Sequence, residues 1–155
     1  MMLTLLKDFG DIVEVLWQER ARYAVIGGVA VVIYGSLRTT QDMDFLIHPE
    51  DVDRVIARLR RRGYRETQGA WTFRDSQLTL RRLWRKHPRQ EDATLVDFLV
   101  AGLPRHFEII DKAAPEPWRG DCELRLAQKD DLLWLKSFRN SGTDQQDAEF
   151  LKHGG

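Results

Sequence analysis

Residues 23–47 read YAVIGGVAVVIYGSLRTTQDMDFLI, and this stretch decides the fold. The apolar run 23–26 has the length and composition of a buried strand. Gly27-Gly28 ends that run, and the apolar run 29–34 predicts a short buried helix. Asp42-Met43-Asp44 then begins a second apolar strand. The stretch therefore predicts a strand, a glycine turn, a short helix and a second strand, in that order.

Two carboxylates occupy positions i and i+2 of the second strand. Because side chains alternate between the faces of a strand, Asp42 and Asp44 should project to one side while Met43 points to the other. Mg²⁺ prefers hard oxygen ligands and is usually held by one or two carboxylates together with substrate phosphates. The pair is therefore a candidate metal site. The alternative is a solvated strand edge or a helix cap, where Asp-x-Asp pairs are more common.

Gly27 and Gly28 stand where backbone can come close to a phosphate chain. The N–H groups and positive dipole end of the short helix that follows favour an anion. A glycine pair after a strand is often only a tight turn. The order of the motifs nevertheless favours a nucleotide site, and it makes Arg38 and Thr40, which precede the carboxylate pair, further candidate nucleotide-binding residues.

A third carboxylate, Asp97, stands at the centre of a predicted buried strand, residues 95–100. An unpaired carboxylate is costly to bury, so Asp97 needs a partner. One candidate is an arginine, since the chain has many. The other is the metal site of Asp42 and Asp44, where Asp97 would bind a second metal ion and help to deprotonate an attacking hydroxyl.

Residues 23–30 and 35–45 resemble the core of the minimal nucleotidyltransferases of the DNA polymerase β superfamily. They are most similar to the branch that contains the AbiEii-type toxins of bacterial toxin–antitoxin systems. The resemblance implies an α/β (α+β) fold, with a mixed central sheet flanked by helices and a helical C-terminus. It also implies a glycine turn that cradles an NTP, an Asp-x-Asp pair that binds metal and a third Asp nearby. These roles pass to Gly27, Gly28, Asp42, Asp44 and Asp97.

The C-terminal part resembles the same branch through a lysine or arginine and an Asp-x-x-Asp motif on helices. The resemblance implies that Lys136 contacts the nucleotide phosphates. Arg139, Asp144 and Asp147 depart from the tighter spacing of the branch. For these three residues, a surface helix pair held by salt bridges is an equal alternative.

Basic side chains gather in two places although the formal net charge is zero. The first group lies on a predicted amphipathic helix, and the second follows the alternating segment 71–83. Such runs are usually solvated faces. The alternative is a phosphate track for RNA, with Trp71 or Trp84 available for stacking. The candidate RNA-binding residues are Arg54, Arg58, Arg61, Arg62, Arg82 and Arg85.

Composition agrees with one nucleotidyltransferase domain over residues 1–155, with a catalytic core at about 22–100 and a helical part at about 103–152. The chain is 43% hydrophobic and 31% charged, as in ordinary globular proteins. It shows no membrane-spanning run, and its single cysteine fits a reducing cytoplasm. The four histidines lack the spacing of zinc ligands.

Further elements follow from periodicity and turn residues. Helices are predicted at the N-terminus and, later, over 104–113, 129–139 and 144–152, and strands over 43–47, 64–66, 70–74, 77–84 and 122–127. Between these elements, residues 87–92 should form a loop, and Pro115-Glu116-Pro117 should break the chain.

These features together predict a nucleotidyltransferase that moves an NMP from an NTP to an acceptor hydroxyl and releases pyrophosphate. The expected cofactor is Mg²⁺, as two ions, with Mn²⁺ as an alternative. RNA is the expected acceptor, at a tRNA 3′ end, and a cognate antitoxin or toxin is an expected partner. The alternatives are AMPylation of a partner protein and a non-catalytic module that binds RNA or a partner.

Overall fold

A computed structural model describes residues 2–37, 40, 42–88, 93–138 and 142–153. Its helices are α1 (Met2–Gln18), α2 (Gly27–Ile33), α3 (Val52–Arg61), α4 (Pro104–Lys112), α5 (Lys129–Lys136) and α6 (Gly142–His153). Its strands are β1 (Tyr23–Ile26), β2 (Asp42–Ile47), β3 (Arg65–Glu66), β4 (Trp71–Thr72), β5 (Thr79–Arg85), β6 (Thr94–Val100), β7 (Ala114–Arg119) and β8 (Cys122–Leu126).

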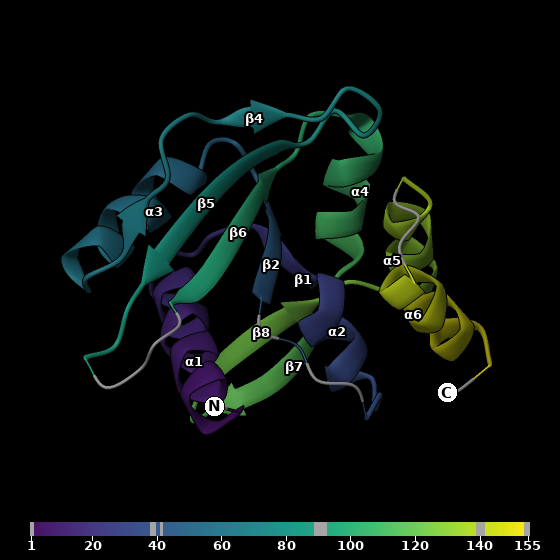
Figure 1. Cartoon of the computed structure of the whole chain (residues 1–155), viewed down its shortest axis with the longest axis horizontal. Coiled ribbons are helices and arrows are strands. Elements are labelled where there is room, and N and C mark those ends of the chain that lie inside the picture. Colours follow the sequence, from purple (N-terminus) through teal and green to yellow (C-terminus); the bar gives the residue numbers. More distant parts are fainter. Residues whose placement is uncertain (1, 38–39, 41, 89–92, 139–141, 154–155) are drawn as a thin grey trace.

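The strands form one mixed sheet in the order β3-β5-β6-β2-β1-β8-β7, and β4 pairs with the first two residues of β5 (Figure 1). Strand β2 is antiparallel to β1 and parallel to β6. The strand that carries Asp97 therefore lies directly beside the strand that carries Asp42 and Asp44. This neighbourhood places the three carboxylates in the middle of the sheet.

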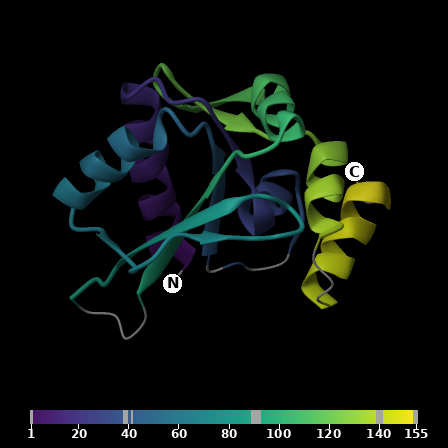
Figure 2. The ribbon, with the colours of Figure 1, turned by 90° about the horizontal axis from the view of Figure 1, so that it is seen from above.

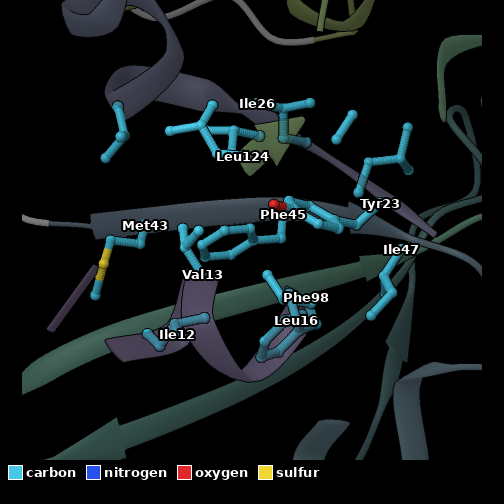
Figure 3. Packing of buried hydrophobic residues seen from close by; sticks show 14 of the residues in the cluster. Ile12, Val13, Leu16, Tyr23, Ile26, Met43, Phe45, Ile47, Phe98 and Leu124 are labelled. Carbon is cyan, nitrogen blue, oxygen red and sulfur yellow. The ribbon is translucent and has the colours of Figure 1, made fainter. Parts of the chain in front are cut away.

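The main core lies between the sheet and α1 (Figure 3). The ring of Phe45 stacks between Phe9 of α1, at 5.8 Å between centroids, and Phe98 of β6, at 5.5 Å. Met43, on the same face of β2 as Phe45, is fully buried. Because side chains alternate along a strand, this packing turns Asp42 and Asp44 to the opposite face of β2.

Helices α5 and α6 pack against each other at one end of the molecule, beside α4 (Figures 1 and 2). The turn that joins β4 to β5 reaches toward α5 (Figure 2). The sheet face with the three carboxylates therefore has a wall of C-terminal helix on one side. None of the helices in the described part of the chain has the length and apolar character that a membrane crossing requires.

Most predicted elements are present, with two differences. Helix α2 begins at Gly27 itself, so the glycine pair is its first turn. The predicted break at Pro115-Glu116-Pro117 is wrong, because these residues lie in β7. Strand β7 is the edge of the sheet, where a proline can leave its nitrogen without a ladder partner. Of the predicted loop 87–92, residues 89–92 fall outside the described residues.

Candidate active site

Asp44 and Asp97 lie opposite each other on adjacent strands. They are register partners in the parallel β2–β6 ladder, so their side chains leave the sheet on the same face. Asp42, two residues earlier on β2, shares this face and is exposed, whereas Asp97 is buried. The structure therefore brings together the three carboxylates that the sequence singled out.

Asp97 has an arginine partner. The Arg82 guanidinium donates two hydrogen bonds to its carboxylate, from Nε to Oδ1 at 2.7 Å and from Nη2 to Oδ2 at 2.9 Å. Arg82 is also the register partner of Asp97 in the antiparallel β5–β6 ladder. Both partners expected for Asp97, an arginine and the Asp42–Asp44 pair, are thus present, one on each neighbouring strand. The hydrogen bonds to Asp97 raise the pKa of Arg82, and Asp42 and Asp44 add to this rise.

Gly27 makes room for Asp44. Its φ of +69° lies in the left-handed region that favours glycine. A Cβ added at Gly27 would collide with the Asp44 carboxylate. The sequence predicted that the glycines make room for phosphates. In the structure, the group that leaves no room for a side chain at position 27 is the Asp44 carboxylate. Gly28 follows Gly27 as a buried residue of α2.

A cavity of about 520 Å³ opens beside these residues. Its polar lining includes the three carboxylates, Arg82 and Lys136, together with Arg74, Asp75 and Ser76 of the β4–β5 turn. Its apolar lining comes from the same turn, from α5 and from the residues just after α5, and it includes Phe73, Leu78, Leu132, Leu135 and Phe138. The volume falls in the range of ligand clefts, which is about 300–1,000 Å³. The cavity can therefore receive a charged group and an apolar ring at the same time.

Lys136 reaches the cavity from the last turn of α5. Its Nζ lies 2.8 Å from Oδ2 of Asp147 on α6, and the two side chains are only 10% and 2% exposed. Asp147, for which the sequence left two roles open, thus fastens α6 to α5 and holds the ammonium group of Lys136. The salt-bridged helix pair and the cavity-lining lysine occur together.

The remaining residues predicted for the nucleotide site and the C-terminal motif are Arg38, Thr40, Arg139 and Asp144. Thr40 donates a hydrogen bond from Oγ1 to the backbone carbonyl of Asp42 at 3.2 Å. Arg38 and Arg139 lie outside the described residues, as does the side chain of Asp144.

The candidate RNA-binding arginines do not form one surface. Arg54 and Arg58 of α3 pair with Glu19 at the end of α1. Arg82 lies in the cavity. Arg61 and Arg62 are exposed at the end of α3, and neither pairs with an acidic side chain of the described residues.

Arg85 belongs to a buried cluster that sequence analysis missed. Its Nη2 donates to Asp8, a fully buried carboxylate of α1 that also accepts a hydrogen bond from Thr94 and lies 2.9 Å from His87. Burial alone would raise the pKa of Asp8, but these hydrogen bonds outweigh it and lower the pKa. The cluster ties α1 to β5 and β6. Its only sequence signal was a lone Asp on the apolar side of an amphipathic helix.

The residues present suit a divalent cation in part. Asp42 and Asp44 supply carboxylate oxygens on one face beside a cavity, which is the donor chemistry that Mg²⁺ requires. Asp97, the third expected ligand, is engaged by Arg82. Within the described residues, no three His, Cys, Asp or Glu side chains are arranged as a ready set of metal ligands.

Solved structures share this architecture. The lincosamide antibiotic adenylyltransferase LnuA, with lincomycin bound, is 20% identical to this chain. The match covers 95% of this chain and 96% of LnuA, with a TM-score of 0.61. ANT(2″)-Ia, in complex with adenylyl-2″-tobramycin, is 14% identical over 96% of this chain and 87% of its own, with a TM-score of 0.64. JHP933 from Helicobacter pylori is 18% identical over 97% of this chain and 66% of its own chain, with a TM-score of 0.61.

No protein-family model matches the chain, and the comparison with curated proteins found no match either. Likeness at such low identity is evidence of fold. The matches to LnuA and ANT(2″)-Ia extend over 95% and 96% of this chain. The chain therefore has the mixed α/β fold of the nucleotidyltransferases, as its sequence predicted.

Proposed function

We propose that the chain is a metal-dependent nucleotidyltransferase that transfers an NMP from an NTP to an acceptor hydroxyl. One observation carries this proposal: Asp42, Asp44 and Asp97 share one face of β2 and β6 and line a cavity that Lys136 also reaches. The fold neighbours named for adenylyl transfer support the same reaction class.

Asp42 and Asp44 are the residues that would hold Mg²⁺, or Mn²⁺ in its place, together with the phosphates of the nucleotide. A cation held there would supply positive charge that neutralises the phosphates. A second ion would need Asp97 as a ligand. Lys136, which lines the same cavity, is suited to donate hydrogen bonds to phosphate oxygens.

The reaction is an in-line displacement at the α-phosphorus. The acceptor oxygen forms a bond to phosphorus, the bond to the pyrophosphate oxygen breaks, and the hydroxyl proton passes to a carboxylate. We assign the proton to Asp97. In the nucleotide-free chain, Arg82 donates one hydrogen bond to each oxygen of Asp97 and so orients the carboxylate.

RNA is the acceptor that we propose from the sequence, with a tRNA 3′ end as the specific site. Arg61 and Arg62, both exposed, support it, and Trp71, 66% exposed, offers a ring for stacking. The resemblance to AbiEii-type toxins adds a cognate antitoxin or toxin as a partner. Growth arrest on expression, relieved by a co-expressed neighbouring gene product, would test that role.

A small hydroxyl compound is a second candidate acceptor. The observation in its favour is the apolar part of the cavity lining, which includes Phe73 of the β4–β5 turn and Phe138, just after α5. LnuA and ANT(2″)-Ia, which share the fold, are described with lincomycin and with an adenylylated tobramycin. Such compounds would enter the cavity whole, whereas only the end of an RNA strand would enter it.

The test is transfer of label from each α-labelled NTP, with Mg²⁺, into three separate acceptor pools. These pools are total bacterial tRNA, lysate protein and a small-molecule extract. The control is the Asp42→Asn, Asp44→Asn double variant, whose folding is checked by circular dichroism. Because Asp42 is exposed and Asp44 borders a cavity, we expect the variant to fold.

Label in tRNA that the double variant does not transfer would support the RNA acceptor and would identify the base. Label only in protein would favour AMPylation, and label only in the extract would favour the small acceptor. Equal labelling by the double variant would overturn the assignment of Asp42 and Asp44. No labelling, together with no Mg²⁺-dependent NTP binding by calorimetry, would favour a non-catalytic binding module.

A further inference from the structure

Arg82 fills a position beside Asp97 where the proposed function would place a cation. The pair is bidentate, which is the strongest geometry for a guanidinium and a carboxylate. Asp97 contributes a side chain that is only 11% exposed, while that of Arg82 is 40% exposed. The carboxylate is thus fixed in the sheet, and the arginine covers it from the cavity.

Charge balance explains why Arg82 lies there. Asp44 and Asp97 face the cavity from opposed register positions, and Asp42 adds a third negative charge. Like charges this close repel unless a cation lies among them. The cavity lining also includes Lys136, which is bound to Asp147, and Arg74 of the β4–β5 turn. Arg82 supplies positive charge directly to Asp97, because it donates a hydrogen bond to each oxygen of that carboxylate.

The pair differs from the structural ion pairs of the same strand. Arg81, the preceding residue, points to the other face of β5 and bonds to Glu66 and Asp53, away from the cavity. Arg82 lines the cavity, and five N–H donors leave it capacity beyond Asp97. Triphosphate oxygens would give the guanidinium an alternative bidentate partner if it left the carboxylate.

We propose that Arg82 competes with a divalent cation for Asp97, so that the nucleotide-free chain binds one such ion, at Asp42 and Asp44. A second ion then binds at Asp97 only after Arg82 has moved away. This inference rests on the proposed function for the identity of the metal ligands. It assigns to Arg82 a positioning role, because the residue controls when Asp97 is free to bind a cation.

The test counts Mn²⁺ ions bound per chain by electron paramagnetic resonance, with isothermal calorimetry for affinity, in the absence of nucleotide. The wild-type chain should bind one ion. Arg82→Gln keeps a hydrogen-bonding amide but removes the charge, and it should bind a second ion at least about tenfold more tightly than the wild type does. Arg81→Gln is the matched control and should behave as the wild type, because Arg81 points to the opposite face of β5.

The inference would be overturned if the nucleotide-free wild type bound two Mn²⁺ ions with equal affinity. It would also be overturned if Arg82→Gln bound the second ion no more tightly than the wild type does. If Arg82→Gln does not fold, Arg82→Lys keeps the charge and loses the bidentate geometry, and the second site should still tighten, by a smaller factor. The Asp42→Asn, Asp44→Asn double variant separates the two proposals. If it binds Mn²⁺ as the wild type does, the metal site of the proposed function fails, whatever the result for Arg82.

Discussion

The carboxylate of Asp44 lies so close to the backbone of Gly27 that no side chain fits between them. Ile26, the residue before Gly27, is the register partner of Asp44 in the β1–β2 ladder, so the contact follows from strand pairing. The first turn of α2 thus forms one wall around a candidate metal ligand. A residue with a Cβ at position 27 would have to push Asp44 away.

Gly27→Ala should therefore impair metal and nucleotide binding as well as stability. The matched control is Gly69→Ala, since Gly69 also has a positive φ, +83°, but a Cβ there would meet nothing within 4 Å. Both variants should lose about 1 kcal/mol of unfolding free energy from backbone strain. Only Gly27→Ala should also lose at least about tenfold in Mg²⁺-dependent NTP affinity, measured by calorimetry. Equal behaviour of the two variants would contradict this account.

The Lys136–Asp147 pair allows stability and activity to be separated. Lys136→Met leaves the buried Asp147 carboxylate without the ammonium group, so unfolding free energy should fall by about 3 kcal/mol in urea denaturation. The double variant Lys136→Met, Asp147→Leu should regain much of this loss because no charge is left buried. Nucleotidyl transfer should stay low in both variants, since both lack the lysine.

The control on the same helix is Lys129→Met. The Nζ of Lys129 lies 5.3 Å from the centroid of the Tyr34 ring, and the substitution should lower the unfolding free energy by only about 0.5–1 kcal/mol. Full activity in the stable double variant would show that Lys136 acts only as a structural residue.

Asp51 links stability to pH. Its carboxylate accepts hydrogen bonds from the backbone N–H of Arg22 at 2.8 Å and from Nε at 2.9 Å. Burial alone would raise the pKa of Asp51, but the hydrogen bonds from Arg22 outweigh it and lower the pKa from 3.8 to about 2. A lowered pKa means that this stabilisation is complete above pH 3.8 and is lost as the pH falls through 2.

Asp51→Asn should therefore lower the unfolding free energy at pH 7 by about 1–2 kcal/mol, because Arg22 is half exposed and partly screened. It should also reduce the slope of stability against pH between the two pKa values. The control is Glu50→Gln. Glu50 pairs with the same arginine, but its side chain is 74% exposed, so this variant should change the unfolding free energy little. An unchanged acid slope in Asp51→Asn would contradict the assignment.

Local signals explain which parts of this fold were predictable. The succession of β1, Gly27, α2 and β2 follows from periodicity and glycine placement within one short stretch. The burial of Asp97 was likewise evident from the apolar residues on either side of it. These features depend on near neighbours in the chain.

Strand pairing explains the rest. No local pattern indicates that β6 pairs in parallel with β2 so that Asp97 faces Asp44, or that β5 brings Arg82 to Asp97. Arg82 was predicted as an RNA contact because its neighbours in sequence are basic, whereas its surroundings depend on the partner strand. Pro115 was predicted to break the chain because nothing in the sequence identifies β7 as an edge strand.

If RNA is the acceptor, arginines at the C-terminal end of α3 should contribute unequally to the salt dependence of tRNA binding. Arg61 and Arg62 are exposed and unpaired with acidic groups of the described residues, so they are free to contact phosphates. Arg58 donates to Glu19 at 3.1 Å and to Gln18 at 2.7 Å, so it is already engaged.

Each phosphate contact that is lost should reduce the slope of log affinity against log salt by about 1. Arg61→Gln and Arg62→Gln should each do so in tRNA binding measured by fluorescence anisotropy, while Arg58→Gln should leave the slope unchanged and lower stability by less than about 1 kcal/mol. The same slope in all three variants and the wild type would remove the support that α3 lends to RNA, and the cavity would then favour a small acceptor.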